Sequence, residues 1–185
     1  MPKGLNVMDM TEHTVEHTRL YQGLIVDVEM DRVRLPDGKI ARREIVVHPG
    51  GVAMLPLNDD GTVTMVRQYR YAYASELLEI PAGKLEEGED PEQCALRELK
   101  EEIGVQVGEL ISLGSVYPSP GFCRETLYLY LARGLTYGER CPDEGEFLEL
   151  ERVPFDELLA RVMNDEIKDG KTVTAVLKTK VLLEL

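Results

Sequence analysis

Three glutamates on one short segment constrain this chain more than any other feature. Glu98, Glu101 and Glu102 stand at positions i, i+3 and i+4 of a stretch with helical periodicity. Helical residues three and four apart share one face, with about 5–6 Å between their Cβ atoms. Three carboxylates so close repel one another unless a hard cation lies between them. The spacing therefore indicates either a solvated acidic face or a site for a divalent metal ion.

The segment around these glutamates carries the signals of a helix from about residue 90 to residue 103. Asp90 can cap its N-terminus, Pro91 suits its first turn, and Gly104 can end it. Apolar residues recur at every fourth position and give the helix one buried stripe. We therefore expect the three carboxylates to be held on a rigid element.

The charge balance of the whole chain favours the metal. The 185 residues include 34 Asp and Glu against 21 Lys and Arg, which gives a formal charge of −13. A nucleic-acid-binding protein normally has a basic patch, so we expect no nucleic-acid partner. An acidic protein that handles phosphates needs a divalent cation between itself and its substrate. Mg²⁺ fits because it prefers oxygen ligands and bridges to phosphates, with Mn²⁺ as a substitute.

Three features of the sequence favour a cytoplasmic location. No stretch of 18 apolar residues occurs, so we expect no membrane-spanning helix and no membrane partner. The N-terminal residues lack the apolar core of a signal peptide. Cys94, Cys123 and Cys141 are odd in number and form no CxxC pair, which is typical of reduced thiols in a cytoplasm.

The predicted order is strands, one helix, then strands and helices, which indicates an α+β fold or mixed α/β/α layering. We expect a flexible or partner-dependent arm over residues 1–19 and a hairpin of strands 21–35 and 40–48. A second strand pair is expected at 52–57 and 62–71. The remaining expected strands are 77–81, 110–117, 126–134 and 147–153, and the expected C-terminal helices are 154–164 and 171–184.

The loop and helix from Gly83 to Val105 read GKLEEGEDPEQCALRELKEEIGV. This run fills every specified position of the Nudix box, G-x5-E-x7-R-E-U-x-E-E-x-G-U, where U is aliphatic. The matching residues are Gly83, Glu89, Arg97, Glu98, Leu99, Glu101, Glu102, Gly104 and Val105. The chain therefore resembles the Nudix hydrolases, and the match favours the metal site over a solvated acidic face.

The resemblance implies an α/β/α sandwich with a mixed sheet, and Mg²⁺-dependent hydrolysis of a nucleoside diphosphate linked to another group. The metal ligands implied by motif position are the Ala82 carbonyl, Glu98, Glu101 and Glu102. Arg97 stands four residues before Glu101 and can hold it by a charge-assisted pair, so both are assigned to the catalytic machinery. Glu89, near the helix start, could return toward the same metal.

Residues outside the box resemble the ADP-ribose pyrophosphatase subfamily. Pro120 lies fifteen residues after Val105, as in that subfamily, and the runs VRQYRYAYASELLEIPAGKLEEGE and ARREIVVHPGGVAMLPL are also similar to it. The resemblance covers about residues 20–185 and implies cleavage of ADP-ribose to AMP and ribose 5-phosphate. Two alternatives stay open. One is another substrate, such as GDP-mannose, ADP-glucose or an oxidised nucleotide, and the other is a catalytically silent sensor of ADP-ribose.

The subfamily resemblance also assigns substrate contacts. Arg70, in the QYR run, matches an arginine that contacts the substrate phosphates. Arg43 is the candidate for a second such arginine, with Arg42 as the alternative register. A planar guanidinium suits bidentate phosphate contacts. Gly121 and Phe122 are expected to shape the pocket near the terminal ribose.

Two further side chains are assigned by the same resemblance. In the late acidic loop, Glu146 resembles the glutamate that activates or positions the attacking water, with Glu144 as the alternative. Some relatives stack adenine on an aromatic residue from the N-terminal region. This chain has no Trp, so Tyr21 is the candidate for that role.

The chain is expected to have two parts. Residues 1–48 form an N-terminal arm and β-hairpin for dimerisation and for covering the substrate, and residues 49–185 form the Nudix hydrolase domain. The resemblance implies a homodimer in which strands over about residues 20–48 reach the partner and complete its pocket. The alternating apolar face of the first hairpin is compatible with such cover.

Two other motifs point to different chemistry and are set aside. His13 to His17 spell H-x-x-E-H, a zinc-peptidase pattern, but they lie in a polar terminal segment. Gly170, Lys171 and Thr172 resemble the end of a phosphate-binding loop, but Asp165 stands where that motif requires glycine. We expect the second motif to start the last helix.

Overall fold

The computed structural model describes residues 8–143 and 145–184, and the chain divides into two compact units. The smaller unit comprises Met1–His48 and Ser119–Glu125. The larger unit comprises Pro49–Pro118 and Thr126–Leu185.

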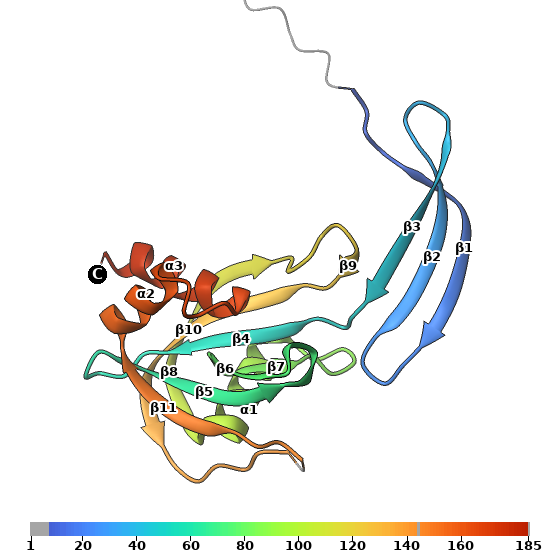
Figure 1. The fold of residues 1–185 in the computed structure, drawn as a ribbon. Coiled ribbons are helices and arrows are strands. Elements are labelled where there is room, and N and C mark those ends of the chain that lie inside the picture. The colour runs from blue at the N-terminus through green and yellow to red at the C-terminus, as the bar shows by residue number, and fades with distance from the viewer. Residues whose placement is uncertain (1–7, 144, 185) are drawn as a thin grey trace, which may run out of the picture. The chain divides into compact units, whose positions relative to one another are not determined.

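The smaller unit is a sheet in the strand order β1-β2-β3-β9 (Figure 1). Its strands are β1 (His13–Gln22), β2 (Asp27–Arg34), β3 (Ile40–Val47) and β9 (Cys123–Arg124). The expected hairpin is confirmed, because β2 pairs antiparallel with β3. The expected arm over residues 1–19 is wrong from His13 onward, where β1 pairs antiparallel with β2. Almost every side chain of β1 is exposed, so the strand is held by backbone pairing. Its sequence therefore lacks the alternating apolar pattern that would predict a strand.

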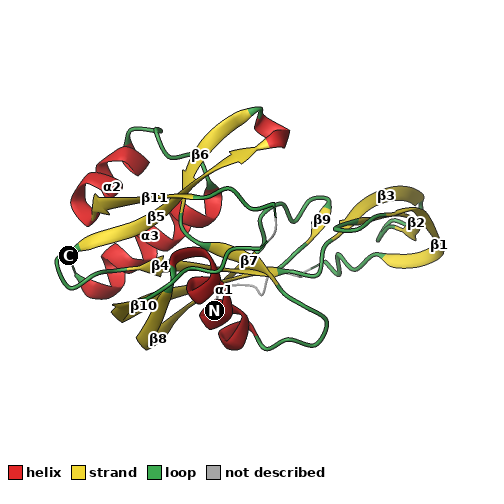
Figure 2. Ribbon diagram, turned by 90° about the horizontal axis from the view of Figure 1, so that it is seen from below, coloured by secondary structure: helices red, strands yellow, loops and turns green. Residues whose placement is uncertain are grey.

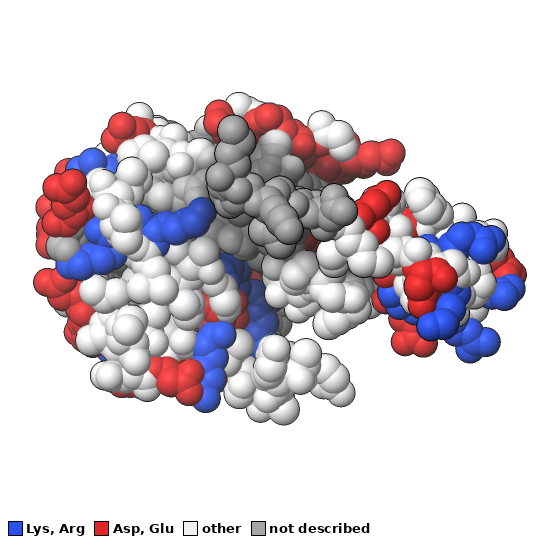
Figure 3. Space-filling view, turned by 90° about the horizontal axis from the view of Figure 1, so that it is seen from above, with Lys and Arg blue, Asp and Glu red and all other residues white. Residues whose placement is uncertain are grey.

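The charged side chains of the smaller unit are mixed in sign (Figure 3). Ion pairs join Arg32 to Glu16 at 2.9 Å and Arg43 to Glu12 at 2.5 Å. Both pairs link side chains of different segments across the sheet surface. Exposed pairs of this kind contribute little stability, so the strand ladders hold this unit together.

The larger unit contains two sheets. The mixed sheet has the order β7-β4-β10-β8, with β4 parallel to β10 and the other pairs antiparallel. Its strands are β7 (Ala82–Lys84), β4 (Gly51–Pro56), β10 (Leu127–Tyr137) and β8 (Val105–Val116). The second sheet, β11-β5-β6, is antiparallel. Its strands are β11 (Glu149–Pro154), β5 (Thr62–Arg70) and β6 (Ser75–Glu79), and the short helix η1 (Tyr71–Tyr73) joins β5 to β6.

The expected pairing of strands 52–57 and 62–71 is wrong. β4 and β5 belong to different sheets, and only an isolated bridge between Leu57 and Val63 links the two segments. The turn between them is short, but β4 is buried along its whole length and pairs on both sides within the mixed sheet. Burial on both faces therefore outweighs the local hairpin signal.

Helices cover both faces of the mixed sheet, as expected for an α/β/α sandwich (Figure 2). Helix α1 (Pro91–Ile103) packs in one apolar cluster with Val52 and Met54 of β4. Helices α2 (Phe155–Met163) and α3 (Gly170–Leu183) pack in a second cluster with Ala53 and Leu55. Alternate residues of one strand thus face opposite layers. Within the part of the chain that the structure describes, no helix is long and apolar enough to cross a membrane.

Helix α1 begins and ends where its sequence predicts. The Asp90 side chain accepts hydrogen bonds from the backbone N–H of Glu92 at 3.0 Å and of Gln93 at 3.2 Å. Gly104 ends the helix with φ of +69°, a conformation that favours glycine. A Cβ on Gly104 would also lie 2.8 Å from the Gly138 carbonyl oxygen. The caps fix the register of the glutamate face.

Candidate active site

Arg97 lies at the centre of a carboxylate cluster at the start and middle of α1. Its guanidinium donates to Glu89 through Nε at 2.9 Å and Nη2 at 3.0 Å. Nη1 donates to Glu98 at 2.8 Å and to Glu101 at 3.0 Å. The hydrogen bonds from Arg97 lower the pKa of Glu89 to about 2. The predicted pairing of Arg97 with Glu101 is present, and Glu89 returns to the same arginine.

Glu102 is a buried carboxylate, with only 2% of the residue exposed. Its Oε2 accepts a hydrogen bond from the backbone N–H of Ala82 at 3.1 Å. Burial raises the pKa of Glu102 to about 8, and the charge of Glu98 acts in the same direction. Among the described residues, no Lys, Arg or His forms an ion pair with Glu102. Burial without a paired cation therefore favours the neutral form of Glu102, and a cation bound beside it would favour the charged form.

Glu98 lies directly over the backbone of β7. A Cβ on Gly83 would lie 1.8 Å from Cδ and 2.0 Å from Oε1 of Glu98. On the other side, a Cβ on Gly51 would lie 2.7 Å from the Gly83 carbonyl oxygen. Burial raises the pKa of Glu98 despite its pairing with Arg97. Glycine at position 83 lets Glu98 approach β7 closely, and glycine at position 51 lets β7 lie close to β4.

This donor set suits a hard cation. Glu98 and Glu102 are carboxylates held away from water with raised pKa values, and oxygen donors of this kind bind Mg²⁺. Within the described ranges, no three His, Cys, Asp or Glu side chains stand together as a preformed metal site. The physical reason is that Arg97 draws Glu98 and Glu101 to its guanidinium. Each carboxylate gives one oxygen to Arg97, Oε1 of Glu98 and Oε2 of Glu101, so its other oxygen could bind a metal ion while the arginine holds it in place.

Glu146 faces the same carboxylates from the exposed loop between β10 and β11. Its charge raises the pKa of both Glu98 and Glu102, which means that it lies within electrostatic range of them. The alternative candidate, Glu144, lies outside the described residues. The loop therefore adds a further negative group to an already acidic site.

Arg70, the last residue of β5, is held by Glu79, the last residue of β6. Its Nε donates to Oε1 of Glu79 at 2.9 Å, and its Nη2 donates to Oε2 at 2.6 Å. The hydrogen bonds to Glu79 raise the pKa of Arg70, and the charges of Asp169 and Glu102 add to this effect. The larger unit thus brings Arg70 into the field of the α1 carboxylates.

Sequence reasoning missed Glu79 and its second partner, Lys171. Glu79 is 1% exposed and pairs with Lys171 as well as with Arg70. The sequence does contain a signal for Glu79, because this residue interrupts the apolar run from Leu77 to Ile80. A carboxylate inside such a strand must be paired when it is buried. The partners themselves could not be read from the sequence.

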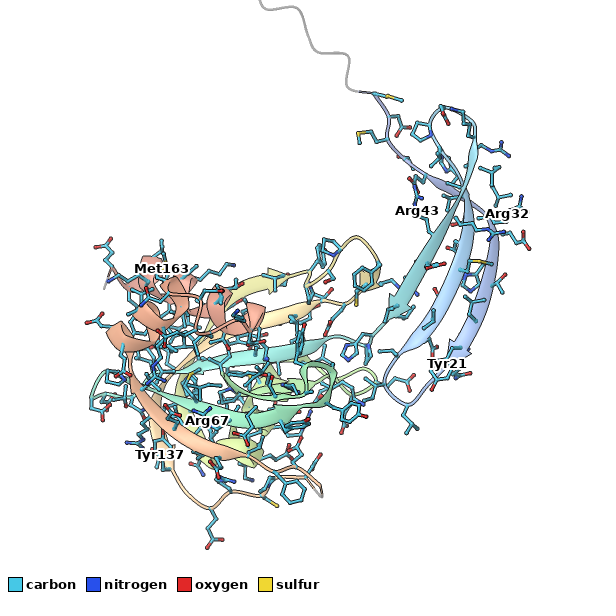
Figure 4. The ribbon with its side chains drawn as sticks, viewed as in Figure 1. Tyr21, Arg32, Arg43, Arg67, Tyr137 and Met163 are labelled. Atoms are coloured by element: carbon cyan, nitrogen blue, oxygen red, sulfur yellow. The ribbon has the colours of Figure 1, made fainter. Side chains whose placement is uncertain are left out.

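Four predicted substrate contacts belong to the smaller unit. Tyr21 is 59% exposed near the end of β1, and Arg43 lies on β3 (Figure 4). The guanidinium of Arg43 is paired with Glu12. Phe122 is 58% exposed, and its carbonyl accepts from the Val46 N–H at 2.8 Å. Gly121 precedes it, and a Cβ at position 121 would meet no atom within 4 Å.

Comparison with known proteins adds independent findings. A family model described as the NUDIX domain matches residues 47–175. A Bacillus subtilis (strain 168) protein named ADP-ribose pyrophosphatase is 41% identical over 169 residues, which cover 90% of this chain and 91% of the relative. A Bacillus methanolicus protein named methanol dehydrogenase activator is 42% identical over 167 residues, which cover 89% and 90%. A solved structure described as an ADP compounds hydrolase has a TM-score of 0.84 and 21% identity, and covers 94% of both chains.

Proposed function

The chain belongs to the NUDIX family, and from that premise we propose that it hydrolyses the pyrophosphate bond of ADP-ribose to AMP and ribose 5-phosphate with Mg²⁺. The observation that carries the proposal is Glu102, a buried carboxylate of α1 that has no ion-pair partner among the described residues and lies within electrostatic range of Arg70 at the end of β5. The substrate follows from the 41% identity to a protein named ADP-ribose pyrophosphatase over nearly the whole chain.

Each side of the site has a distinct task. Glu98, Glu101, Glu102 and the Ala82 carbonyl would hold the metal, and Arg97 would orient Glu101 and balance the charge of Glu89. A bound Mg²⁺ would neutralise the pyrophosphate and polarise a phosphorus atom. Arg70 would contact a phosphate through its guanidinium. The reaction adds water across one P–O–P linkage, so the leaving phosphate takes up one proton and the water gives one up.

We assign acceptance of that proton to Glu146. Its side chain is exposed on the loop, and its charge contributes to the raised pKa values of Glu98 and Glu102. A general base must come within about 2.6–3.2 Å of the water, and exposed loops of this kind close when substrate binds. Glu144 remains the alternative base, because it lies two residues away in the same loop.

The smaller unit is proposed to serve dimerisation and substrate cover. Residues 1–48 would complete the pocket of a second copy, and residues 49–185 would be the catalytic domain. Arg43, Gly121 and Phe122 would contact the phosphates and the terminal ribose, and Tyr21 would stack on adenine. Exposed apolar side chains support a partner, since Leu24 is fully exposed and Ile25 is 61% exposed. A small-molecule substrate and a second copy, in the cytoplasm, are the only partners proposed.

A substrate panel tests the proposal. Turnover of ADP-ribose, ADP-glucose, GDP-mannose, NADH and 8-oxo-dGTP is measured with Mg²⁺ by phosphate-coupled detection, with Glu102→Gln as the blank. We expect a clear preference for ADP-ribose. A preference for another compound would keep the metal site but replace the substrate. Binding of ADP-ribose without turnover would replace catalysis by sensing.

A further inference from the structure

Three ionised side chains from distant parts of the larger unit form one array. Arg70 comes from β5, Glu79 from β6 and Lys171 from the first turn of α3. Glu79 accepts from both cations, although Lys171 lies 92 residues away in the sequence. All three residues line one cavity of about 670 Å³. The array therefore borders space that a ligand can enter.

The geometry leaves one edge of Arg70 available. Glu79 takes the Nε and Nη2 donors of the guanidinium. Among the described residues, Nη1 of Arg70 donates no hydrogen bond, and the side chain is 39% exposed. A guanidinium has five N–H donors in a fixed plane, so a carboxylate on one edge sets the direction of the other edge. Glu79 thus decides where Arg70 can offer donors to an anion.

Lys171 gives the Glu79 carboxylate a second cation. Lys171 has a side chain that is only 10% exposed, and it shares the Glu79 carboxylate with Arg70. Lys171 also pairs with Asp169, so the cluster carries two positive and two negative charges, and Lys171 acts on Arg70 by holding the shared Glu79 carboxylate in place.

The backbone around Lys171 is fixed by the residues on either side of it. Asp169 caps α3 by accepting from the Thr172 N–H at 3.0 Å, and it accepts from Lys171 Nζ at 2.8 Å. The Thr172 hydroxyl accepts from the Ile80 N–H at 3.0 Å. Because Ile80 directly follows Glu79, the start of α3 is tied to the end of β6 at two adjacent points, Thr172 to Ile80 and Lys171 to Glu79. The Gly-Lys-Thr motif thus serves a connection between elements.

We propose that Glu79 and Lys171 are positioning residues for Arg70: Glu79 directs its free edge toward the substrate phosphates, and Lys171 holds the Glu79 carboxylate in the orientation that does so. The inference rests on the proposed function, since it takes Arg70 as the phosphate contact. It adds two residues of β6 and α3 to the determinants of substrate affinity. Neither residue is expected to touch the reacting atoms.

A double-mutant cycle between Arg70→Ala and Lys171→Met tests the proposal on the full chain with ADP-ribose and Mg²⁺. We expect Lys171→Met to raise KM roughly tenfold with little change in kcat, because a phosphate contact is weakened in ground and transition states alike. In the Arg70→Ala background, Lys171→Met should add no further effect on kcat/KM. Lys168→Met is the matched control, because Lys168 lines the same cavity but pairs with Asp165. Equal KM values for the Lys171 and Lys168 variants, or additive effects in the cycle, would overturn the proposal.

A second measurement does not depend on turnover. The Arg70 Nε–H signal in the ¹⁵N NMR spectrum, identified by its loss in Arg70→Ala, should exchange slowly in wild type and in Lys168→Met. It should exchange faster in Lys171→Met, where the array is incomplete. Unchanged exchange in Lys171→Met would contradict the positioning role, even if the double variant does not fold. A wild type with slow exchange but no ADP-ribose turnover would instead reject the proposed function and leave the ordering of Arg70 supported.

Discussion

Gly83 lies directly beneath the carboxylate of Glu98, so that a Cβ on Gly83 would come within 1.8 Å of Glu98 Cδ. The contact joins the middle of α1 to strand β7, whose Ala82 N–H binds Glu102. One short strand therefore determines the placement of two of the three α1 carboxylates. The first glycine of the box motif, Gly83, is explained by this close approach and not by a left-handed backbone, since its φ is not positive.

Gly83→Ala should displace Glu98 while leaving the fold intact. The backbone of Gly83 is compatible with alanine, so the cost falls on the Glu98 side chain. A displacement of about 1 Å in a catalytic group can cost about 10²-fold in rate, and we expect kcat/KM to fall by that order. Gly138→Ala is the control, because a Cβ there meets only the Gly104 carbonyl oxygen at 3.7 Å. Equal activity of both variants would show that Glu98 needs no such contact.

Glu102→Gln should reduce turnover by at least about 10²-fold with folding retained, because a metal ligand supplies several kcal/mol of charge stabilisation. Glutamine has almost the same shape and can still accept from the Ala82 N–H. Steady-state kinetics measures the loss of turnover, and circular dichroism checks that the fold is retained. Glu92→Gln, an exposed carboxylate in the first turn of α1, should be neutral. Near-wild-type turnover of Glu102→Gln would remove this residue from the metal site.

Mg²⁺ should raise the melting temperature of the wild type, and chelation by EDTA should remove the effect. A ligand that binds only the folded state stabilises it in proportion to its concentration relative to Kd. Glu102 is buried and has no ion-pair partner among the described residues, so a bound Mg²⁺ should interact with it strongly. The melting temperature of the Glu102→Gln variant should therefore rise much less with Mg²⁺. Differential scanning fluorimetry at several Mg²⁺ concentrations measures both shifts. Identical shifts in the two proteins would place the ion elsewhere.

Glu79→Gln should destabilise the protein at pH 7 by about 3–5 kcal/mol, because it leaves two cations without their shared carboxylate. Burial favours the neutral acid, but hydrogen bonds from Arg70 and the charge of Lys171 outweigh it and hold the pKa of Glu79 below 4.5. A carboxyl with a lowered folded pKa stabilises above its unfolded pKa, and this stability is lost as pH falls through the folded pKa. The difference between wild type and variant should therefore shrink below about pH 4.5. Urea unfolding at pH 7 and pH 3.5 gives the comparison, and a constant difference would refute the charge argument.

A dimer that uses the smaller unit should depend on the turn between β1 and β2. Leu24 and Ile25 are exposed there, and a partner that covers them would be lost when both become aspartate. Light scattering coupled to size exclusion should show a dimer for the wild type and a monomer for the double variant. Lys39→Ala, in the turn between β2 and β3, is the control. A wild-type monomer at micromolar concentration would reject the dimer.

Local signals account for the parts of this protein that could be predicted. The start of α1 depends on Asp90 and its end on Gly104, and each acts within one helical turn. The spacing of Glu98, Glu101 and Glu102 determines their common face for the same reason. Strand β1 was not predicted because its side chains are exposed and mostly polar. Neither its composition nor a two-residue hydrophobic period indicates a strand.

The sequence by itself determined the capped helix, the glutamates on it, the β2–β3 hairpin and the family to which these belong. Only the tertiary structure decided that β4 pairs with β10 and β7, and that Glu79 joins Arg70 to Lys171. The physical reason is the range of the interactions. Caps and i, i+4 contacts act between residues that are close in the chain. Strand pairing and buried ion pairs join distant residues, and many distant partners are equally suitable by their local sequence. The packing of the whole unit determines which of these partners pair.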